Sequence, residues 1–248
     1  MVAHLGIDVG GSFIKVAAVD VDRGVLIGEV RRLVTPPRCT PAQLLAALEE
    51  ITASYPDCET VGVAFPAVVR AGVVLTATNI DVSWIGFDLV DAWRERSESK
   101  LVLVHDSDAA GIAEMQFGAG RGRVGRIMML TLGTGIGTTL FIGGHMYGNL
   151  ELGRLRMGEL EAEQRASARA RIERGLGWEA WAHELNSVLA EYHRLLWPDT
   201  FIIGGGASEE FEAFSKWLQS PAEILSARLG NAAGVIGAAL MASQQLSL

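Results

Sequence analysis

Two short glycine-rich turns constrain the fold of this chain more than any other feature of its sequence. Residues 8–12 read Asp-Val-Gly-Gly-Ser, and residues 133–137 read Gly-Thr-Gly-Ile-Gly. Each turn follows an apolar, strand-like segment and leads into another such segment rather than into a helix. Glycine lets a ligand approach the backbone closely, and consecutive amide groups form a concavity that binds anions. The repeated pattern therefore predicts two β-hairpins whose turns clamp a phosphate chain.

The spacing of the glycines excludes two familiar phosphate-binding motifs. A Walker loop needs Gly-x-x-x-x-Gly-Lys-Ser/Thr before a helix, and a dinucleotide-binding fold needs its glycines where a strand meets a helix. Either turn alone could still be a tight hairpin without a ligand. A third glycine cluster, residues 204–206, precedes a predicted helix N-terminus, a position that favours an anion. Three such clusters together favour binding of a nucleotide or a polyphosphate.

Composition and charge limit the class of protein. A chain of 248 residues can form one large or two modest domains, and its net charge of −8 disfavours binding to nucleic acid. No apolar run approaches the roughly 18 residues of a membrane span, and we find no secretion signal. Two cysteines fit a reducing compartment and cannot form a four-thiolate zinc site. We therefore expect a cytoplasmic protein that binds neither nucleic acid nor a membrane.

The predicted elements alternate between strands and helices, which favours sheets covered by helices. Thr40 and Pro41 predict a helix N-terminus, and we expect Ser208 and Asn231 to cap two later helices. Apolar residues at helical spacing over residues 178–195 are expected to be core. The other predicted strands are residues 25–34, 60–65, 73–75, 100–104 and 200–203, and the other predicted helices are residues 109–117 and 160–174.

The chain is expected to be an α/β protein of two domains around a central cleft. The first domain would comprise residues 1–107, completed by a C-terminal helix over residues 231–246. The second would comprise residues 108–230. A hinge near residue 108 would place one glycine turn on each side of the cleft.

Carboxylates at strand ends are the predicted catalytic groups. Asp8 ends a strand beside two glycines, which suits a Mg²⁺ ion or its waters. Asp106 ends a strand before a predicted helix and can accept the proton of a substrate hydroxyl, as phosphoryl transfer requires. Asp108 is the competing base, although it is better placed to cap the helix. The alternative for residues 105–107 is a capping cluster, and adjacent residues do not readily form a hydrolase triad.

Five segments resemble, in order, motifs of the ROK sugar kinases, and their full pattern resembles the polyphosphate/ATP-dependent glucokinase branch. The resemblance covers nearly the whole chain. It implies an actin-like, ribonuclease-H-like two-domain fold, a homodimer, and phosphoryl transfer from ATP or polyphosphate to a sugar 6-hydroxyl, and the missing zinc motif agrees with this branch. The segments are residues 5–15, 79–86, 106–111, 130–137 and 202–206.

The resemblance also implies roles for individual residues, with Asp106 as the catalytic base. The expected residues of the hexose site are Asn79, Asp81, His105, Glu151, Arg154 and Glu163. The expected phosphate- or nucleotide-binding residues are Asp8, Gly10, Gly11, Ser12, Lys15, Gly133, Thr134, Gly135, Gly205 and Gly206.

Two residues depart from the family pattern on the sugar side. His105 stands where the family has asparagine, and Arg154 replaces the histidine of the Glu-x-Gly-His motif. A site that binds hydroxyl groups is sensitive to such changes, because altered partners leave buried polar groups unpaired. Glucokinase-type activity is the first hypothesis. A changed sugar specificity, an inactive phosphate-binding regulator and an acyl-phosphate kinase are the alternatives, and the last fits the 79–84 loop poorly.

Overall fold

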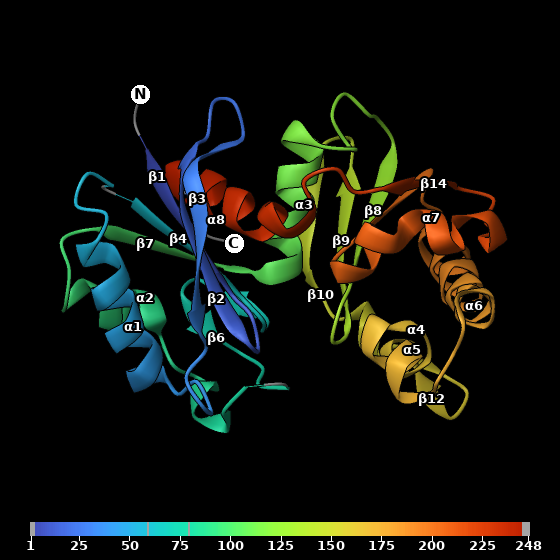
Figure 1. Cartoon of the computed structure of the whole chain (residues 1–248), viewed down its shortest axis with the longest axis horizontal. Helices are drawn as coiled ribbons and strands as arrows, with labels where there is room; N and C mark the ends of the chain where they lie inside the picture. The colour runs from blue at the N-terminus through green and yellow to red at the C-terminus, as the bar shows by residue number, and fades with distance from the viewer. Residues whose placement is uncertain (1–2, 59, 79, 245–248) are drawn as a thin grey trace. The chain divides into compact units, whose positions relative to one another are not determined.

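The computed structural model describes residues 3–58, 60–78 and 80–244, and the chain divides into two compact units (Figure 1). The first unit comprises Met1–Ala113 with Ala232–Leu248, and the second comprises Glu114–Asn231. Among the described residues, no helix is both long enough and apolar enough to span a membrane.

The first unit contains one five-stranded sheet, a small hairpin and four helices that lie wholly or partly within it. Its elements are β1 (His4–Val9), β2 (Phe13–Asp20), β3 (Val25–Val34), α1 (Pro41–Ala53), β4 (Thr60–Phe65), β5 (Val69–Arg70), β6 (Val73–Val74), η1 (Val82–Trp84), α2 (Leu89–Arg94), β7 (Lys100–His105), the first part of α3 (Asp106–Phe117) and α8 (Ala233–Ser243).

The second unit also contains one five-stranded sheet. Its elements are β8 (Arg126–Leu132), β9 (Ile136–Ile142), β10 (His145–Leu150), η2 (Leu152–Arg154), β11 (Arg156–Met157), β12 (Leu160–Glu161), α4 (Ala162–Ala166), α5 (Ala168–Glu173), α6 (Trp178–Leu196), β13 (Thr200–Gly204), η3 (Gly206–Glu210), α7 (Phe211–Phe214), η4 (Ser215–Trp217), β14 (Glu223–Ser226) and η5 (Gly230–Ala232).

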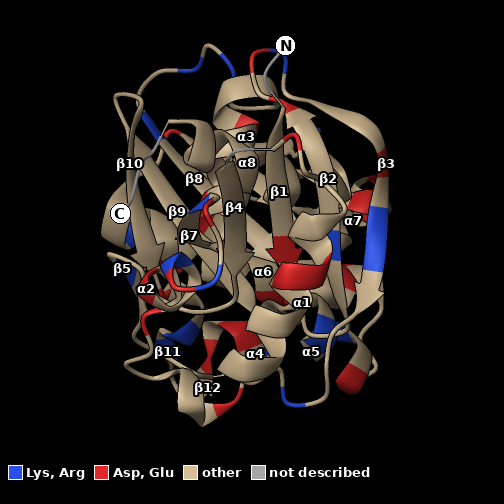
Figure 2. Cartoon of the chain, turned by 90° about the vertical axis from the view of Figure 1, so that its left-hand side faces the viewer, with Lys and Arg blue, Asp and Glu red and all other residues tan. Residues whose placement is uncertain are grey.

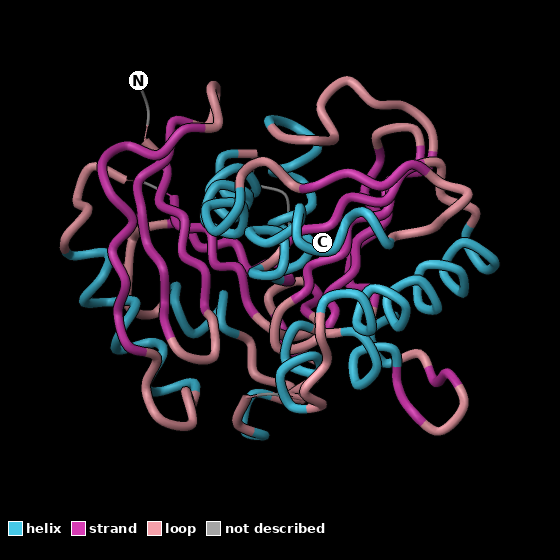
Figure 3. Tube along the Cα trace, turned by 45° about the vertical axis from the view of Figure 1, so that its right-hand side comes forward, coloured by secondary structure: helices cyan, strands magenta, loops and turns pink. Residues whose placement is uncertain are grey.

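The strands of the two sheets are the magenta segments of Figure 3, and the two sheets have equivalent strand orders. The first runs β3-β2-β1-β4-β7 and the second β10-β9-β8-β13-β14. In each sheet the first three strands in sequence are antiparallel neighbours, and the two later strands are parallel to the first. The prediction of two glycine-turn hairpins is therefore confirmed, because β1 pairs with β2 and β8 pairs with β9.

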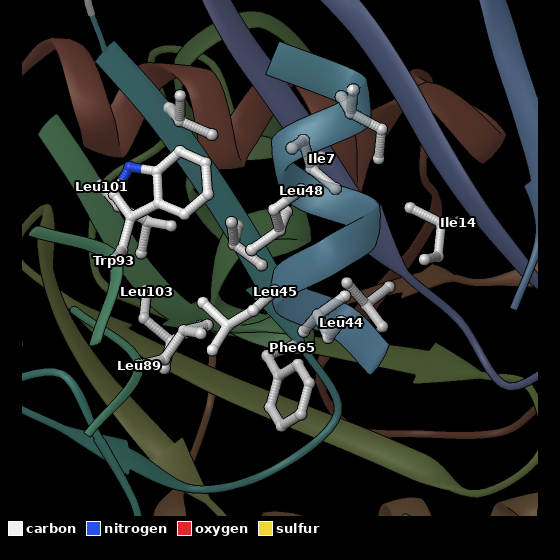
Figure 4. Close-up of a cluster of buried hydrophobic side chains, with 14 of the residues drawn as sticks. Ile7, Ile14, Leu44, Leu45, Leu48, Phe65, Leu89, Trp93, Leu101 and Leu103 are labelled. Atoms are coloured by element: carbon white, nitrogen blue, oxygen red, sulfur yellow. The ribbon is translucent and has the colours of Figure 1, made fainter. Parts of the chain in front are cut away.

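Helix α1 covers one face of the first sheet (Figure 4). The predicted N-terminus is confirmed, since Thr40 and Gln43 form a capping box before Pro41. Leu44 and Leu48 of this helix are fully buried. Burial of such a side chain contributes about 2 kcal/mol, so this face anchors the unit.

Helix α8 covers the opposite face of the same sheet through glycines. A Cβ atom on Gly6 would overlap the backbone oxygen of Val235, and one on Gly62 would overlap that of Ala238. The helix backbone therefore approaches the strands more closely than side chains would permit.

Some boundaries and caps of the predicted helices are wrong. Residues 160–174 form two short helices that separate at Ser167, whose side chain caps α5 by accepting from Ala170. Helix α3 begins at Asp106, three residues earlier than predicted. Asn231 does not cap α8, because its side chain donates to Glu209. The apolar stripe of α6 is buried as expected at Trp181, Leu185, Val188 and Tyr192, whereas Trp178 is partly buried and Leu195 is 44% exposed.

Candidate active site

The first glycine turn joins β1 to β2 and is fastened by the end of β3. Gly10 donates its amide to the Phe13 carbonyl at 3.0 Å. The Thr35 hydroxyl donates to the Gly10 carbonyl at 2.6 Å, and the Thr35 amide donates to the Ser12 carbonyl at 3.0 Å. Gly11 and Ser12 are exposed, and the position of a Cβ atom on Gly11 is open space. The turn is therefore fixed in shape while its backbone stays open to a ligand.

A charged pair stands beside this turn. Asp8 of β1 lies directly opposite Lys15 of β2, and the Lys15 ammonium lies 3.2 Å from the Asp8 carboxylate. The backbone of Gly234 in α8 packs against the same carboxylate, where a Cβ atom would come within 2.9 Å of Asp8 Cγ. The sheet and α8 together fix this pair next to the turn.

Asp106 is the first residue of α3 and directly follows β7. Desolvation by the surrounding protein raises the pKa of its carboxyl to about 6, even though the side chain keeps 41% of its surface exposed. The charge of His105 opposes this rise in pKa, and the negative charges of Asp8 and Asp108 add to it. A raised pKa near neutrality suits a group that accepts a proton during the reaction.

His105 links the two neighbouring carboxylates. Its Nε2 atom lies 3.4 Å from Asp106 Oδ1, and its Nδ1 atom lies 4.0 Å from Asp108 Oδ2 and 2.9 Å from the Ser107 hydroxyl. The side chain of Asp108 is fully buried inside the first turn of α3. Asp108 is therefore not the helix cap that the sequence predicted, and Asp106 is the more exposed of the two carboxylates.

The second glycine turn joins β8 to β9 and is supported by a carboxylate. Gly133 donates to the Gly135 carbonyl at 3.1 Å, and the Ile136 amide donates to Glu163 Oε2 at 3.4 Å. The Arg169 amide donates to the Gly133 carbonyl at 3.1 Å. Thr134, at the tip, is exposed. The carboxylate of Glu163 thus lies behind the turn rather than at its tip.

The third glycine cluster lies beside the second turn. Gly204 ends β13 and pairs with Thr131 of the parallel strand β8. Gly205 has a φ of +75°, and a Cβ atom there would press on the backbone of Leu132. The segment that follows is the 3-10 helix η3 rather than a regular helix, and Ser208 lies inside it. The two glycine clusters therefore leave neighbouring strands at the same edge of the second sheet.

The predicted sugar-binding residues lie in several segments. Glu151 and Arg154 are exposed at the two ends of the segment containing η2, and Asn79 lies outside the described residues. Gly153 packs between them against the Ile136 carbonyl and Glu163, so the structure brings Glu163 close to this segment. Burial and the nearby charge of Glu163 raise the pKa of Tyr192, whose hydroxyl donates to the Leu152 carbonyl at 2.8 Å.

The carboxylate of Asp81 is bound by Ser83 of its own loop and by Arg38. It accepts from the Ser83 amide at 3.0 Å and hydroxyl at 2.6 Å, and pairs with Arg38 at 2.6 Å. These hydrogen bonds, led by those from Ser83, lower the pKa of Asp81 to about 2. Asp81 therefore carries a negative charge that shapes the 79–84 loop.

Two residues near the glycine turns carry no motif in the sequence. Thr35 follows β3 and reaches Gly10 only because β3 pairs with β2. Gly153 supports the second turn from a segment 17 residues beyond Ile136. The strand predicted over residues 25–34 could have pointed to Thr35, whereas no local signal points to Gly153.

Two α/β units of equivalent strand order, each with a glycine turn after its first strand, define the actin-like, ribonuclease-H-like class of fold. The sequence pattern of the ROK family matches residues 4–160. The polyphosphate glucokinase of Mycobacterium tuberculosis (strain CDC 1551 / Oshkosh) is 39% identical over 236 residues, covering 95% of this chain and 89% of that protein.

Solved structures of sugar kinases are similar to this chain over nearly its whole length. The inorganic polyphosphate/ATP-glucomannokinase from Arthrobacter sp. strain KM matches with a TM-score of 0.94 at 36% identity, covering 99% of this chain and 100% of that one. A ROK family glucokinase from Streptomyces griseus, in complex with glucose and AMPPNP, matches with a TM-score of 0.83 at 27% identity, covering 98% and 99%. The chain belongs to the ROK family, and both the predicted fold class and the predicted resemblance are confirmed.

Proposed function

We propose that this chain is a sugar kinase that transfers a phosphoryl group from polyphosphate or ATP to the 6-hydroxyl of glucose or a related hexose. The observation that carries the proposal is a half-buried carboxylate with a raised pKa, Asp106, which directly follows a strand of the sheet that also carries a phosphate-type glycine turn. The similarity to a polyphosphate glucokinase over 95% of the chain supports the same substrates.

Asp106 acts as the general base. Phosphoryl transfer has a loose transition state, so the attacking hydroxyl becomes acidic late, and a carboxylate is basic enough to accept its proton. With a pKa of about 6, Asp106 is mostly ionised at neutral pH and ready to accept that proton. His105 lies beside Asp106 on one side and the buried Asp108 on the other, and orients the Asp106 carboxylate.

The donor phosphates bind to the open backbone amides of the glycine turns. Lys15 neutralises part of their charge, and its pairing with Asp8 fixes the ammonium beside the first turn. Preorganised amides and cations of this kind stabilise the charge of the phosphoryl group without rearranging. The glycine clusters at residues 133–135 and 205–206 bind the donor in the same way.

Magnesium fits the chemistry of Asp8. Among the described residues, no group of three or more His, Cys, Asp or Glu could hold a metal ion alone. Mg²⁺ in phosphate sites is usually held by one or two carboxylates together with substrate phosphates and water, which suits a single aspartate. Asp8 would hold the ion, which would neutralise phosphate charge.

The acceptor is a hexose. Asn79, Glu151 and Glu163 bind its hydroxyls, while His105 and Arg154 adjust the specificity away from the family pattern. We further propose a cytoplasmic homodimer, in keeping with the family resemblance.

The test is the substitution Asp106→Asn, assayed with hexoses and amino sugars and with both donors. Loss of the base should lower kcat by about 10²- to 10⁴-fold. Asp91→Asn removes an exposed carboxylate of α2 and is the matched control.

Full activity of the Asp106→Asn enzyme would refute the assignment of the base. Absence of turnover in the unmodified protein with every sugar, alongside measurable donor binding, would refute the kinase and support a phosphate-binding regulator.

A further inference from the structure

A row of charged side chains crosses three neighbouring strands of the first sheet. The strand register places Asp8 opposite Lys15, and Lys15 opposite Arg32. Directly opposed residues point to the same face of a sheet, and neighbouring strands lie about 4.8 Å apart. The row therefore leads from Asp8 across β2 to Arg32 on β3, the edge strand.

Asp106 lies toward the other edge, since it follows β7 in the order β3-β2-β1-β4-β7. The register places Asp8 level with Val104, two residues before Asp106, on the far side of β4, and the charge of Asp8 raises the pKa of Asp106. A phosphate chain that extends from Asp106 past Asp8 would thus meet Lys15 next and Arg32 after it.

The neighbouring Arg31 does not belong to this row. It pairs with Val16, whose side chain is buried in the core on the α1 face, and its guanidinium lies 5.9 Å from the centre of the Tyr55 ring. The two arginines are therefore adjacent in sequence but point to opposite faces of the same strand. In Figure 2, where Lys and Arg are blue, a blue segment marks the arginines of β3.

Arg32 is exposed and lacks an acidic partner among the residues that the structure describes. In the same unit, Arg23, Arg38 and Arg96 each pair with a carboxylate. Like charges placed directly opposite each other destabilise a sheet, and Lys15 and Arg32 are such a pair. An anion bound between them would remove this repulsion.

The end of β3 holds Arg32 in register with the phosphate turn. Thr35, three residues further along the chain, makes two hydrogen bonds to Gly10 and Ser12. The distance from Arg32 to the turn is thus fixed by the sheet and by Thr35. A charge on an edge strand also discourages aggregation, but Arg31 would serve that purpose equally well.

We propose that Arg32 binds the donor chain beyond the phosphates held at the first glycine turn, and that it favours long polyphosphate over ATP. This inference rests on the proposed function. A guanidinium can bind phosphate oxygens through paired hydrogen bonds. ATP carries a nucleoside where a long polyphosphate continues as phosphate, so only the longer donor offers a partner to Arg32.

The experiment compares Arg32→Gln with the matched control Arg31→Gln, using ATP, inorganic triphosphate and long-chain polyphosphate as donors to glucose. Loss of one charged hydrogen-bonding contact should raise the KM for long-chain polyphosphate about tenfold more than the KM for ATP. Arg31→Gln should leave the ratio of the two KM values as in the unmodified enzyme. Equal ratios in the two variants would overturn the inference.

A binding measurement separates this inference from the proposed function. Equilibrium dialysis of long-chain polyphosphate against the unmodified protein and both variants needs no turnover. If the unmodified protein transfers no phosphoryl group, the proposed function fails, yet weaker polyphosphate binding in Arg32→Gln than in Arg31→Gln would still support the Arg32 site. Equal binding by the two variants would overturn it.

Discussion

The two glycine turns have the same place in equivalent sheets, but the protein supports them differently. The first turn is held by neutral groups, namely the hydroxyl and amide of Thr35. The second is held by the carboxylate of Glu163, with Gly153 packed tightly behind it. The charged neighbours of the first turn, Asp8 and Lys15, stand beside it on the strands.

The two turns therefore differ in what surrounds them, with open space and charges at the first and close packing behind the second. The first turn keeps open space around Gly11 and has the charged pair of Asp8 and Lys15 beside it. The second turn is supported from behind by Glu163 of α4 and by Gly153, which belongs to the segment carrying Glu151 and Arg154. We therefore expect substitutions behind the second turn to affect stability, and those around the first to affect chemistry.

The largest contrast in stability should come from adding one methyl group to a glycine near each turn. Gly153→Ala would push Cβ into the Ile136 carbonyl, and overpacking of this kind costs about 2–3 kcal/mol. Gly11→Ala meets no atom within 4 Å and should change stability by less than about 0.5 kcal/mol. Urea unfolding measures both, and equal losses would refute the proposed difference in support.

Removing the hydrogen bond behind each turn should have a smaller effect. Glu163→Ala leaves the buried Ile136 amide without its acceptor and should cost about 1–2 kcal/mol, while Thr35→Val should cost about 1 kcal/mol. Glu163→Gln keeps an acceptor and is the control for the loss of charge. A greater loss in Thr35→Val than in Glu163→Ala would reverse the comparison.

The smallest expected effect is a shift in the pH dependence of kcat. Only substitutions in the first unit should cause it. Asp106 must be ionised to act as a base, so activity should fall as the pH drops through about 6. A protonated His105 lowers the pKa of Asp106, and therefore His105→Asn should move this acid limb to higher pH. Profiles of kcat against pH test it, with Asp91→Asn, which removes an exposed carboxylate of α2, as the control. A shift to lower pH in His105→Asn would contradict the assignment.

Much of the candidate site could be predicted because its residues are close in sequence. The hairpins follow from apolar runs on both sides of each glycine turn, and Asp106 follows from its place at the end of a strand. The exact start of α3 was missed, because a helix can begin at any of several polar residues when tertiary contacts favour it. The prediction that Asp108 caps this helix is therefore wrong, since Asp108 is fully buried within its first turn.

Other parts of the fold depend on contacts between distant segments. Glu114 is one example, since its buried carboxylate accepts from the amides of Ala119, Arg228 and Leu229 at 2.7–2.9 Å. Nothing in the sequence around Glu114 distinguishes it from a solvated helix residue. A buried carboxylate needs such donors, and only the folded chain supplies them.

The sequence by itself determined the two glycine turns, the α/β pattern and the position of Asp106 directly after a strand, because local spacing and residue type are sufficient for each. Only the tertiary structure decided that Thr35 fastens the first turn, that Glu163 braces the second, and that Arg32 stands in line with Lys15. The physical reason is strand register. Pairing brings residues from separate segments onto one face of a sheet, and a shift by a single residue would turn Arg32 to the other face.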